Sequence, residues 1–106
     1  MSPTIIVGFD GSDAGRDALA LGAILRDATG ARLLAVSAYE HGSYEASPPP
    51  ERSRSLRRDA EIAAEEARGW LEDAPRSESC VIGAPSPARA LHEAAVREQE
   101  IGRAHV

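Results

Sequence analysis

Three short apolar runs, each followed by a long stretch with helical spacing, limit most strongly what this chain can fold into. The runs cover residues 4–9, 31–38 and 77–84. The first, "TIIVGF", is apolar on both faces, which is typical of a strand inside a parallel sheet. Strands that alternate with helices form parallel sheets with right-handed crossovers. The order β-α-β-α-β-α therefore predicts an α/β fold with one parallel sheet.

The first helix has clear start and stop signals. Ser12 is suited to cap it, Asp13 places an acid at the positive end of the helix dipole, and Gly30 stands where a helix ends. Apolar residues recur at spacings of four and three and predict the face that packs on the sheet: Ala14, Ala18, Leu21, Leu25 and Ala28.

A polar, proline-rich loop over residues 39–50 precedes the second helix, which is predicted over residues 51–73 and ended by Pro75. Trp70 is expected to pack between this helix and the sheet. In the third helix, Ser86 caps the first turn and Pro87 takes the first position. The predicted inward faces are Leu56, Ala60, Ala63, Ala67 and Trp70 in the second helix, and Leu91, Ala94 and Ala95 in the third.

Amino-acid composition indicates which classes of binding partner are disfavoured and in which cellular compartment the protein is expected. The 106 residues suffice for one domain, and a net charge of -5 argues against nucleic acid and anionic membranes as partners. The single cysteine, Cys80, allows no internal disulfide, so we expect a cytoplasmic protein. No apolar run approaches the ~20 residues of a membrane helix, and residues 1–30 lack the basic flank and long apolar stretch that are typical of a signal peptide.

The final six residues, "IGRAHV", are the in-frame translation of a common sequencing-adapter string, ATCGGAAGAGCACACGTC. We therefore interpret residues 1–100 as an incomplete domain and residues 101–106 as a non-native tail, and the tail is left out of the fold prediction. Sequencing the source gene beyond the codon for Glu100 tests this interpretation.

Residues 5–40, "IIVGFDGSDAGRDALALGAILRDATGARLLAVSAYE", resemble the universal stress protein family, which opens with an apolar strand ending in Asp-Gly-Ser. The later "SCVIGAPSPARALHEAA" resembles the third strand, linker and helix of that family. The resemblance covers about residues 1–100. It implies an open, doubly wound, Rossmann-like sheet of five strands, of the adenine-nucleotide alpha hydrolase type. We expect this chain to supply the first three of these strands and to be truncated before strands four and five. Strand one would lie between strands two and four, so residues 5–7 are expected at an open edge.

Many members of this family bind ATP, with Mg2+, and act in stress response. Their glycine-rich phosphate-binding pattern follows strand four and does not occur in this sequence. By resemblance, Gly8, Phe9 and Asp10 line the nucleotide pocket, and Val36, at the end of strand two, offers backbone groups to adenine. The amides of Gly11 and Ser12 begin a helix, which is a favourable place for an anion. The family also implies a homodimer.

Asp10 has two interpretations. Ligands of open α/β sheets bind at the carboxyl ends of the strands, where the Asp10 carboxylate could accept hydrogen bonds from a ribose hydroxyl or the adenine amino group. Alternatively, Asp10 hydrogen-bonds the turn at Gly11 and Ser12, as aspartate often does.

Other candidate chemistry is weaker. His41, His92 and Cys80 show no metal-ligand spacing, and the absence of lysine excludes a Gly-Lys-[Ser/Thr] phosphate loop. The arginines of "RSRSLRR", residues 52–58, are expected to pair with glutamates about four residues away. With no visible catalytic residues, a non-enzymatic adenine-nucleotide binding or sensing function is favoured. The alternatives are a dimerisation or signalling module that binds no nucleotide, and an ATP pyrophosphatase-type enzyme.

Overall fold

The computed structural model describes residues 3–41 and 50–104. In these residues three strands alternate with three helices, as the sequence predicts. The elements are β1 Thr4–Gly8, α1 Asp13–Thr29, β2 Arg32–Glu40, α2 Pro50–Leu71, β3 Ser77–Ala84 and α3 Pro87–Ala104.

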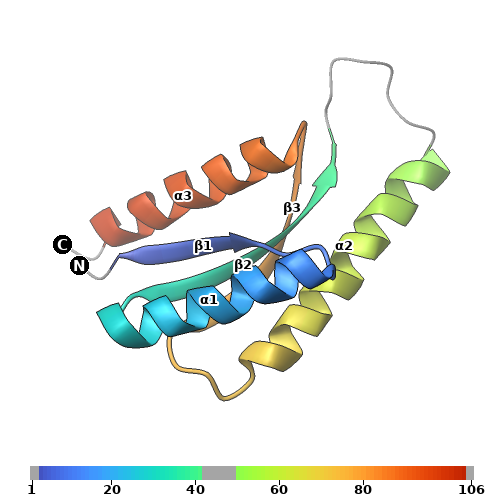
Figure 1. The fold of residues 1–106 in the computed structure, drawn as a ribbon. Coiled ribbons are helices and arrows are strands. Elements are labelled where there is room, and N and C mark those ends of the chain that lie inside the picture. The colour runs from blue at the N-terminus through green and yellow to red at the C-terminus, as the bar shows by residue number, and fades with distance from the viewer. Residues whose placement is uncertain (1–2, 42–49, 105–106) are drawn as a thin grey trace.

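The three described strands form one parallel sheet in the order β1-β2-β3. Helices α1 and α2 cover one face of this sheet, and α3 covers the other (Figure 1). The predicted open, doubly wound parallel sheet is confirmed. Within the described chain β1 has a strand on one side only, so residues 5–7 lie at an edge.

Each face of the sheet has its own apolar core, because successive strand residues point to opposite faces. Toward α1 and α2, Val7, Leu33 and Ala35 pack against Leu19 and against three residues of α2. Toward α3, the strand residues pack on two small helical side chains. The second core consists of Leu34, Val36, Ile82, Ala84, Ala90 and Ala94.

Both ends of α1 match the signals in the sequence. The Ser12 hydroxyl accepts a hydrogen bond from the Gly15 backbone N–H at 3.1 Å. At the other end Gly30 has φ 74°, and its N–H donates to the Arg26 carbonyl at 2.8 Å. Glycine fits this position because it takes the left-handed conformation without strain.

The predicted buried face of α1 is wrong. The buried residues are Gly15, Leu19, Gly22 and Arg26, whereas the predicted face, which includes Leu21 and Leu25, is exposed. The reason is steric: a Cβ on Gly22 would lie 2.8 Å from Leu33 Cδ1 and 3.0 Å from Val7 Cγ2. Helix α1 thus approaches the sheet through its glycines and Leu19, and Leu21 and Leu25 lie on its exposed side.

Arg26 ends this buried face and connects α1 to β3. Its guanidinium donates to the Ser77 hydroxyl at 2.7 Å and to the Asp27 carboxylate at 3.0 Å. The arginine stem is covered while its charged end keeps polar partners.

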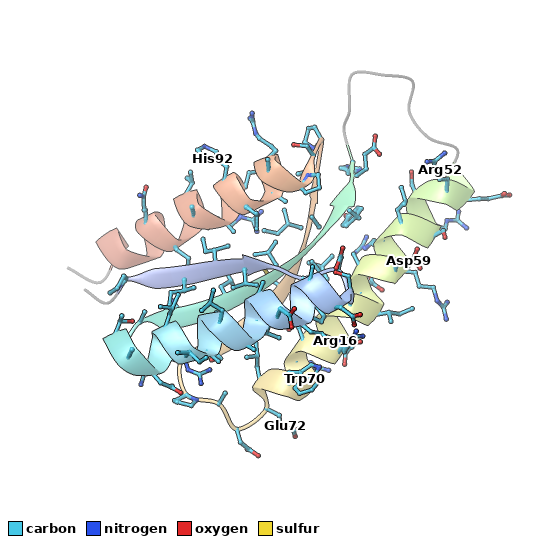
Figure 2. The ribbon with its side chains drawn as sticks, viewed as in Figure 1. Arg16, Arg52, Asp59, Trp70, Glu72 and His92 are labelled. Carbon is cyan, nitrogen blue, oxygen red and sulfur yellow. The ribbon has the colours of Figure 1, made fainter. Side chains whose placement is uncertain are left out.

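The expectation for Trp70 is also wrong. Ala60, Ala63 and Ala67 are buried as the helical spacing predicts, but Trp70 is 65% exposed and lies beside α1 rather than between α2 and the sheet (Figure 2). Leu71, the next residue along α2, takes the place in the core with Ala63 and Ala67.

Several boundaries differ from the sequence prediction by one or two residues: β1 ends at Gly8, β2 begins at Arg32, and α2 extends from Pro50 to Leu71. Strand β2 continues to Glu40, so the predicted loop begins later, and residues 42–49 of that loop lie outside the described residues. Helix α3 begins at Pro87 as predicted and is helical to Ala104, through the first four residues of the proposed tail. Residues 105 and 106 lie outside the described part of the chain.

Candidate functional site

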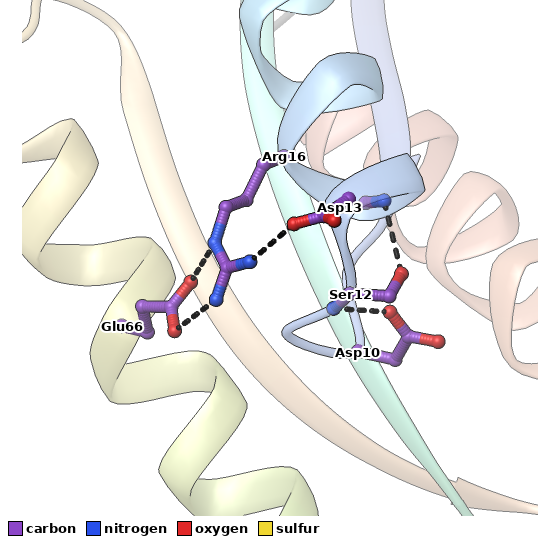
Figure 3. Close-up of polar contacts among 6 residues, drawn as sticks. Asp10, Ser12, Asp13, Arg16 and Glu66 are labelled. Carbon is purple, nitrogen blue, oxygen red and sulfur yellow. Dashed lines mark hydrogen bonds and ion pairs between the residues drawn. The ribbon is translucent and has the colours of Figure 1, made fainter.

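Asp10 follows β1 and folds back on the turn that starts α1. Its Oδ1 accepts a hydrogen bond from the Ser12 backbone N–H at 2.9 Å (Figure 3). Gly11, between them, has φ 84°, a conformation that glycine adopts without strain. The turn interpretation of Asp10 is thus confirmed for one carboxylate oxygen.

The sequence predicts that the amides of Gly11 and Ser12 are a favourable place for an anion, and this arrangement shows which anion the Ser12 amide binds. The Ser12 N–H already binds Asp10, and the Gly15 N–H binds the Ser12 hydroxyl. The anion at this helix start is therefore the protein's own carboxylate. The Ser12 hydroxyl and then the Ser12 backbone N–H lower the pKa of Asp10, so its charged form is favoured.

An ion pair fixes the beginning of α1 against α2. The Arg16 guanidinium donates to both carboxylate oxygens of Glu66, at 3.0 and 3.1 Å, and to Asp13 at 3.0 Å (Figure 3). Such a two-pronged contact sets both distance and orientation. The turn that carries Asp10 is therefore held on a fixed part of the structure.

Beside this turn, the carboxyl ends of β1 and β2 and the first half of α2 line a half-open cavity of about 190 Å³. Three acidic residues, Asp10, Glu40 and Asp59, are among those that line it, and Figure 2 labels Asp59 on α2. The remaining lining residues are Phe9, Ser37, Ala38, Tyr39, Leu56, Ala60 and Ala63. The position at the strand ends is where open α/β sheets bind ligands.

The structure brings together only part of the predicted site. Phe9 is buried and lines the cavity with Asp10, and Gly11 and Ser12 form the adjoining turn. Gly8 is exposed, and a Cβ added there would face Leu91 of α3, which is on the opposite face of the sheet.

Val36 is not at the end of its strand. It is 1% exposed in the middle of β2, and its carbonyl accepts a hydrogen bond from the Phe9 N–H at 2.9 Å. The cavity is lined instead by the four residues that follow it, Ser37–Glu40. The prediction ended this strand at residue 38 because a polar stretch follows, whereas Tyr39 and Glu40 continue the ladder to β3.

Sequence reasoning missed the contribution of α2 to this cavity. Asp59 lies one turn from Leu56 and Ala63, so the helical spacing predicts that it lies beside the inward face of α2. The signal was overlooked because Asp59 stands in a run of charged residues.

A second hollow, of about 300 Å³, lies on the other side of the β2 end. It shares Ala38, Tyr39 and Glu40 with the first and is completed by Pro85, Ser86 and Pro87 at the start of α3. Ser86 caps α3 by accepting from the Arg89 N–H at 3.2 Å. The end of β2 thus forms a wall between two adjoining spaces.

Other reactive side chains lie elsewhere. Cys80 is half-buried against the core under α3, and burial raises the pKa of its thiol. Residues 3–41 and 50–104 contain no group of three potential metal ligands. In the same residues no helix combines the length and the apolar character that crossing a membrane requires.

A parallel sheet covered on both faces, with hollows at the strand ends, defines a doubly wound α/β protein of the kind that binds ligands at that edge. The chain belongs to the universal stress protein family, whose sequence model matches residues 1–100. A comparison with curated proteins finds no match. Among solved structures, a universal stress protein crystallised in complex with cAMP is similar at a TM-score of 0.66 and 22% identity, over 92% of this chain and 70% of that one.

Proposed function

We propose that this universal stress protein domain binds an adenine nucleotide of the ATP type at the carboxyl ends of β1 and β2, as a binding or sensing protein in stress response. The observation that carries the proposal is the cavity between Asp10 and Asp59, at the edge of the sheet where open α/β folds hold ligands. Membership of the family supports it, as does the related fold of a protein solved with cAMP.

The adenosine part, rather than the phosphates, fits the described cavity. Its volume of about 190 Å³ is below the ~300 Å³ at which ligand pockets usually begin, so it admits a base or a ribose. The three acidic residues that line it disfavour phosphate, whereas carboxylates accept hydrogen bonds from hydroxyl and amino groups. Asp10 Oδ1 holds the turn, so the other carboxylate oxygen is the acceptor that we propose for the ligand.

Phosphates would then extend away from this acidic wall, and Mg2+ would reduce their repulsion from it. This predicts that adenosine retains much of the affinity of ATP. It also predicts that Mg2+ strengthens ATP binding and leaves adenosine binding unchanged.

Calorimetric titration of adenosine, cAMP and ATP with and without Mg2+ tests the proposal. Asp10→Ala removes the acceptor and should weaken adenosine binding by about tenfold. Asp10→Asn keeps an oxygen for the Ser12 N–H and removes the charge, so it separates ligand binding from turn stability. Asp17→Asn, an exposed acid further along α1, is the matched control. Unchanged affinity in both Asp10 variants would exclude this site.

We further propose that the protein is cytoplasmic, homodimeric and not an enzyme. The single cysteine supports a reducing compartment, and the large apolar side chains exposed on α1 support self-association. Sedimentation velocity and incubation with ATP, followed by analysis for ADP, test the last two statements. A monomer at all concentrations, or steady ATP turnover, would contradict them.

A further inference from the structure

The first turns of α2 concentrate positive charge in an acidic protein. Residues 51–58 contain four arginines and one glutamate, whereas the whole chain has a net charge of -5. A cation in the first turn of a helix opposes the helix dipole, so Arg52 lowers rather than raises the stability of α2. Departures from the local rules that favour a fold are expected at functional sites. Arg52 is therefore a candidate for binding an anion.

Arg52 also lacks an acidic partner within its own helix. The sequence predicts that these arginines pair with glutamates about four residues away, and Arg57 does so, with Glu61 at 3.1 Å. The residues three and four positions after Arg52 are Ser55 and Leu56, so no acid of α2 lies one turn from it. Pairing within the helix is thus confirmed for Arg57 and does not account for Arg52.

Arg52 lies on the side of α2 that faces the candidate nucleotide cavity. Residues seven apart fall on nearly the same face of a helix, so Arg52, Asp59 and Glu66 form one line along α2. Asp59 lines the cavity with Asp10, and Glu66 binds Arg16 at the start of α1 (Figure 3). Figure 2 labels Arg52 near the start of α2 and Asp59 further along the helix. The line that contains Arg52 therefore passes the turn that carries Asp10.

The part of α2 between the cavity and Arg52 is open to solvent. Two turns of helix separate Arg52 from Asp59, a rise of about 10 Å. Among residues 51–59, Ser53 and Leu56 are partly covered and the others are exposed. A ligand held in the cavity can therefore extend along an exposed stretch of α2 toward Arg52.

Charge distinguishes the two ends of this path. Asp10, Glu40 and Asp59 line the cavity and disfavour phosphate there, whereas Arg52 is the first cation beyond Asp59 on the same line of the helix. A guanidinium group can bind two phosphate oxygens at once. A nucleotide with its base and ribose in the cavity would keep its α-phosphate near the acids and bring its terminal phosphates nearest to Arg52.

We propose that Arg52 binds the terminal phosphates of the nucleotide and makes the site selective for ATP and ADP over AMP and cAMP. This inference rests on the proposed function, because it places adenosine in the cavity beside Asp10 and Asp59. It assigns the phosphate contact to a side chain of α2, away from the amides at the start of α1.

Calorimetric titration of adenosine, AMP, ADP and ATP into the 106-residue protein tests this selectivity. The titrations are made without Mg2+, so that no added divalent cation contributes to the difference between the four compounds. Arg52→Gln should lower the affinity for ATP and ADP by about three- to fivefold, more at low salt, and leave adenosine binding unchanged. Arg52→Lys keeps the charge without the planar donor group and should retain part of the selectivity.

Arg54→Gln is the matched control. It removes the same charge two residues away, about 200° around the helix from Arg52, and should change ATP affinity by less than about twofold. Both arginines are exposed, and both stand near the positive end of α2. The two variants should therefore unfold at the wild-type temperature or slightly above it, which separates a loss of binding from a loss of folding.

Three results would overturn the inference. Equal losses of ATP affinity in Arg52→Gln and Arg54→Gln would indicate general attraction to a basic helix. ATP affinity that Arg52→Gln leaves unchanged, or wild-type protein that binds AMP as tightly as ATP, would exclude the phosphate contact while adenosine binding upholds the proposed function. Absence of adenosine binding to the wild type would instead remove the proposed function, and this inference with it.

Discussion

Gly22 lies where α1 comes nearest to the sheet, and its lack of a side chain is a packing requirement. An added Cβ would lie 2.8 Å from Leu33 and 3.0 Å from Val7, and both of these side chains are buried. Neither can move aside without disturbing the core between α1 and the sheet.

Gly22→Ala is therefore expected to destabilise the protein although alanine favours helix. Overpacking costs about 1–3 kcal/mol and the gain in helix propensity is about 1 kcal/mol, so the free energy of unfolding should fall by about 1 kcal/mol. Gly69→Ala is the matched control, because its added Cβ meets no atom within 4 Å. It should stabilise by about 0.5–1 kcal/mol. Urea denaturation of both variants measures the difference, and equal shifts would contradict the packing argument.

The second prediction at this scale concerns Asp10 and pH. Hydrogen bonds from the Ser12 hydroxyl and backbone N–H lower the pKa of Asp10 in the folded state. In the unfolded chain Asp10 has the ordinary aspartate pKa of about 3.9, so as pH falls it binds a proton there before it does in the folded protein. The contribution of Asp10 to stability is present above that value and is lost as pH falls through the folded pKa.

Wild type should accordingly lose more stability than Asp10→Asn when pH is lowered from about 5 to about 3. Urea midpoints across this range measure the effect. Because Asp10 is exposed, the difference should be small. Parallel pH curves for the two proteins would show that Asp10 is not held by the turn.

At the scale of elements, local signals in the sequence predicted where helices begin and end, but the sequence did not predict which face of α1 packs on the sheet. Caps at Ser12 and Ser86 and the stop at Gly30 were predicted because each depends on neighbouring backbone groups. The buried face of α1 was not predicted, because a hydrophobic pattern cannot show that the closest approach passes through glycines. For the site the limit was similar: Asp10 is local, whereas Glu40 and Asp59 join it only after β2 and α2 pack.

The pairing of β2 with β3 provides a test of one such packed contact. Tyr39 lies directly across from Gly83, and a Cβ at Gly83 would lie 2.6 Å from the tyrosine ring. The ring of Tyr39, which also lines both hollows at the end of β2, thus occupies the space that a side chain would take.

Gly83→Ala should displace this ring and lower the free energy of unfolding by about 1 kcal/mol. In a Tyr39→Ala background the same change should cost nothing, giving a coupling of at least about 0.5 kcal/mol in a double-mutant cycle. Additive effects would mean that the ring does not cover Gly83. Adenosine affinity, measured in parallel, should fall in Gly83→Ala if the wall formed by Tyr39 supports the proposed site.

For the whole molecule, the sequence predicted the alternation of elements and the two-sided covering of the sheet, because crossover connections leave few arrangements. It also predicted the open edge at residues 5–7, but it did not predict the apolar surface that remains on α1. On α1 the exposed flank carries Leu21, Leu25 and Ile24, and in the described sheet β1 beside it has an open edge. Unpaired strand edges and contiguous apolar patches both promote association.

The 106-residue chain is therefore expected to associate as its concentration rises, through α1 and the β1 edge. Leu21→Glu with Leu25→Glu places charges on side chains that are 57% and 42% exposed and should suppress this association. Because neither leucine belongs to the core, the free energy of unfolding should change by less than about 1 kcal/mol. Ile62→Glu, a similarly exposed residue on α2, is the control that adds charge away from α1. Sedimentation velocity at increasing concentration compares the three proteins, and equal association in all of them would show that the α1 flank and the β1 edge are not the surface through which copies meet.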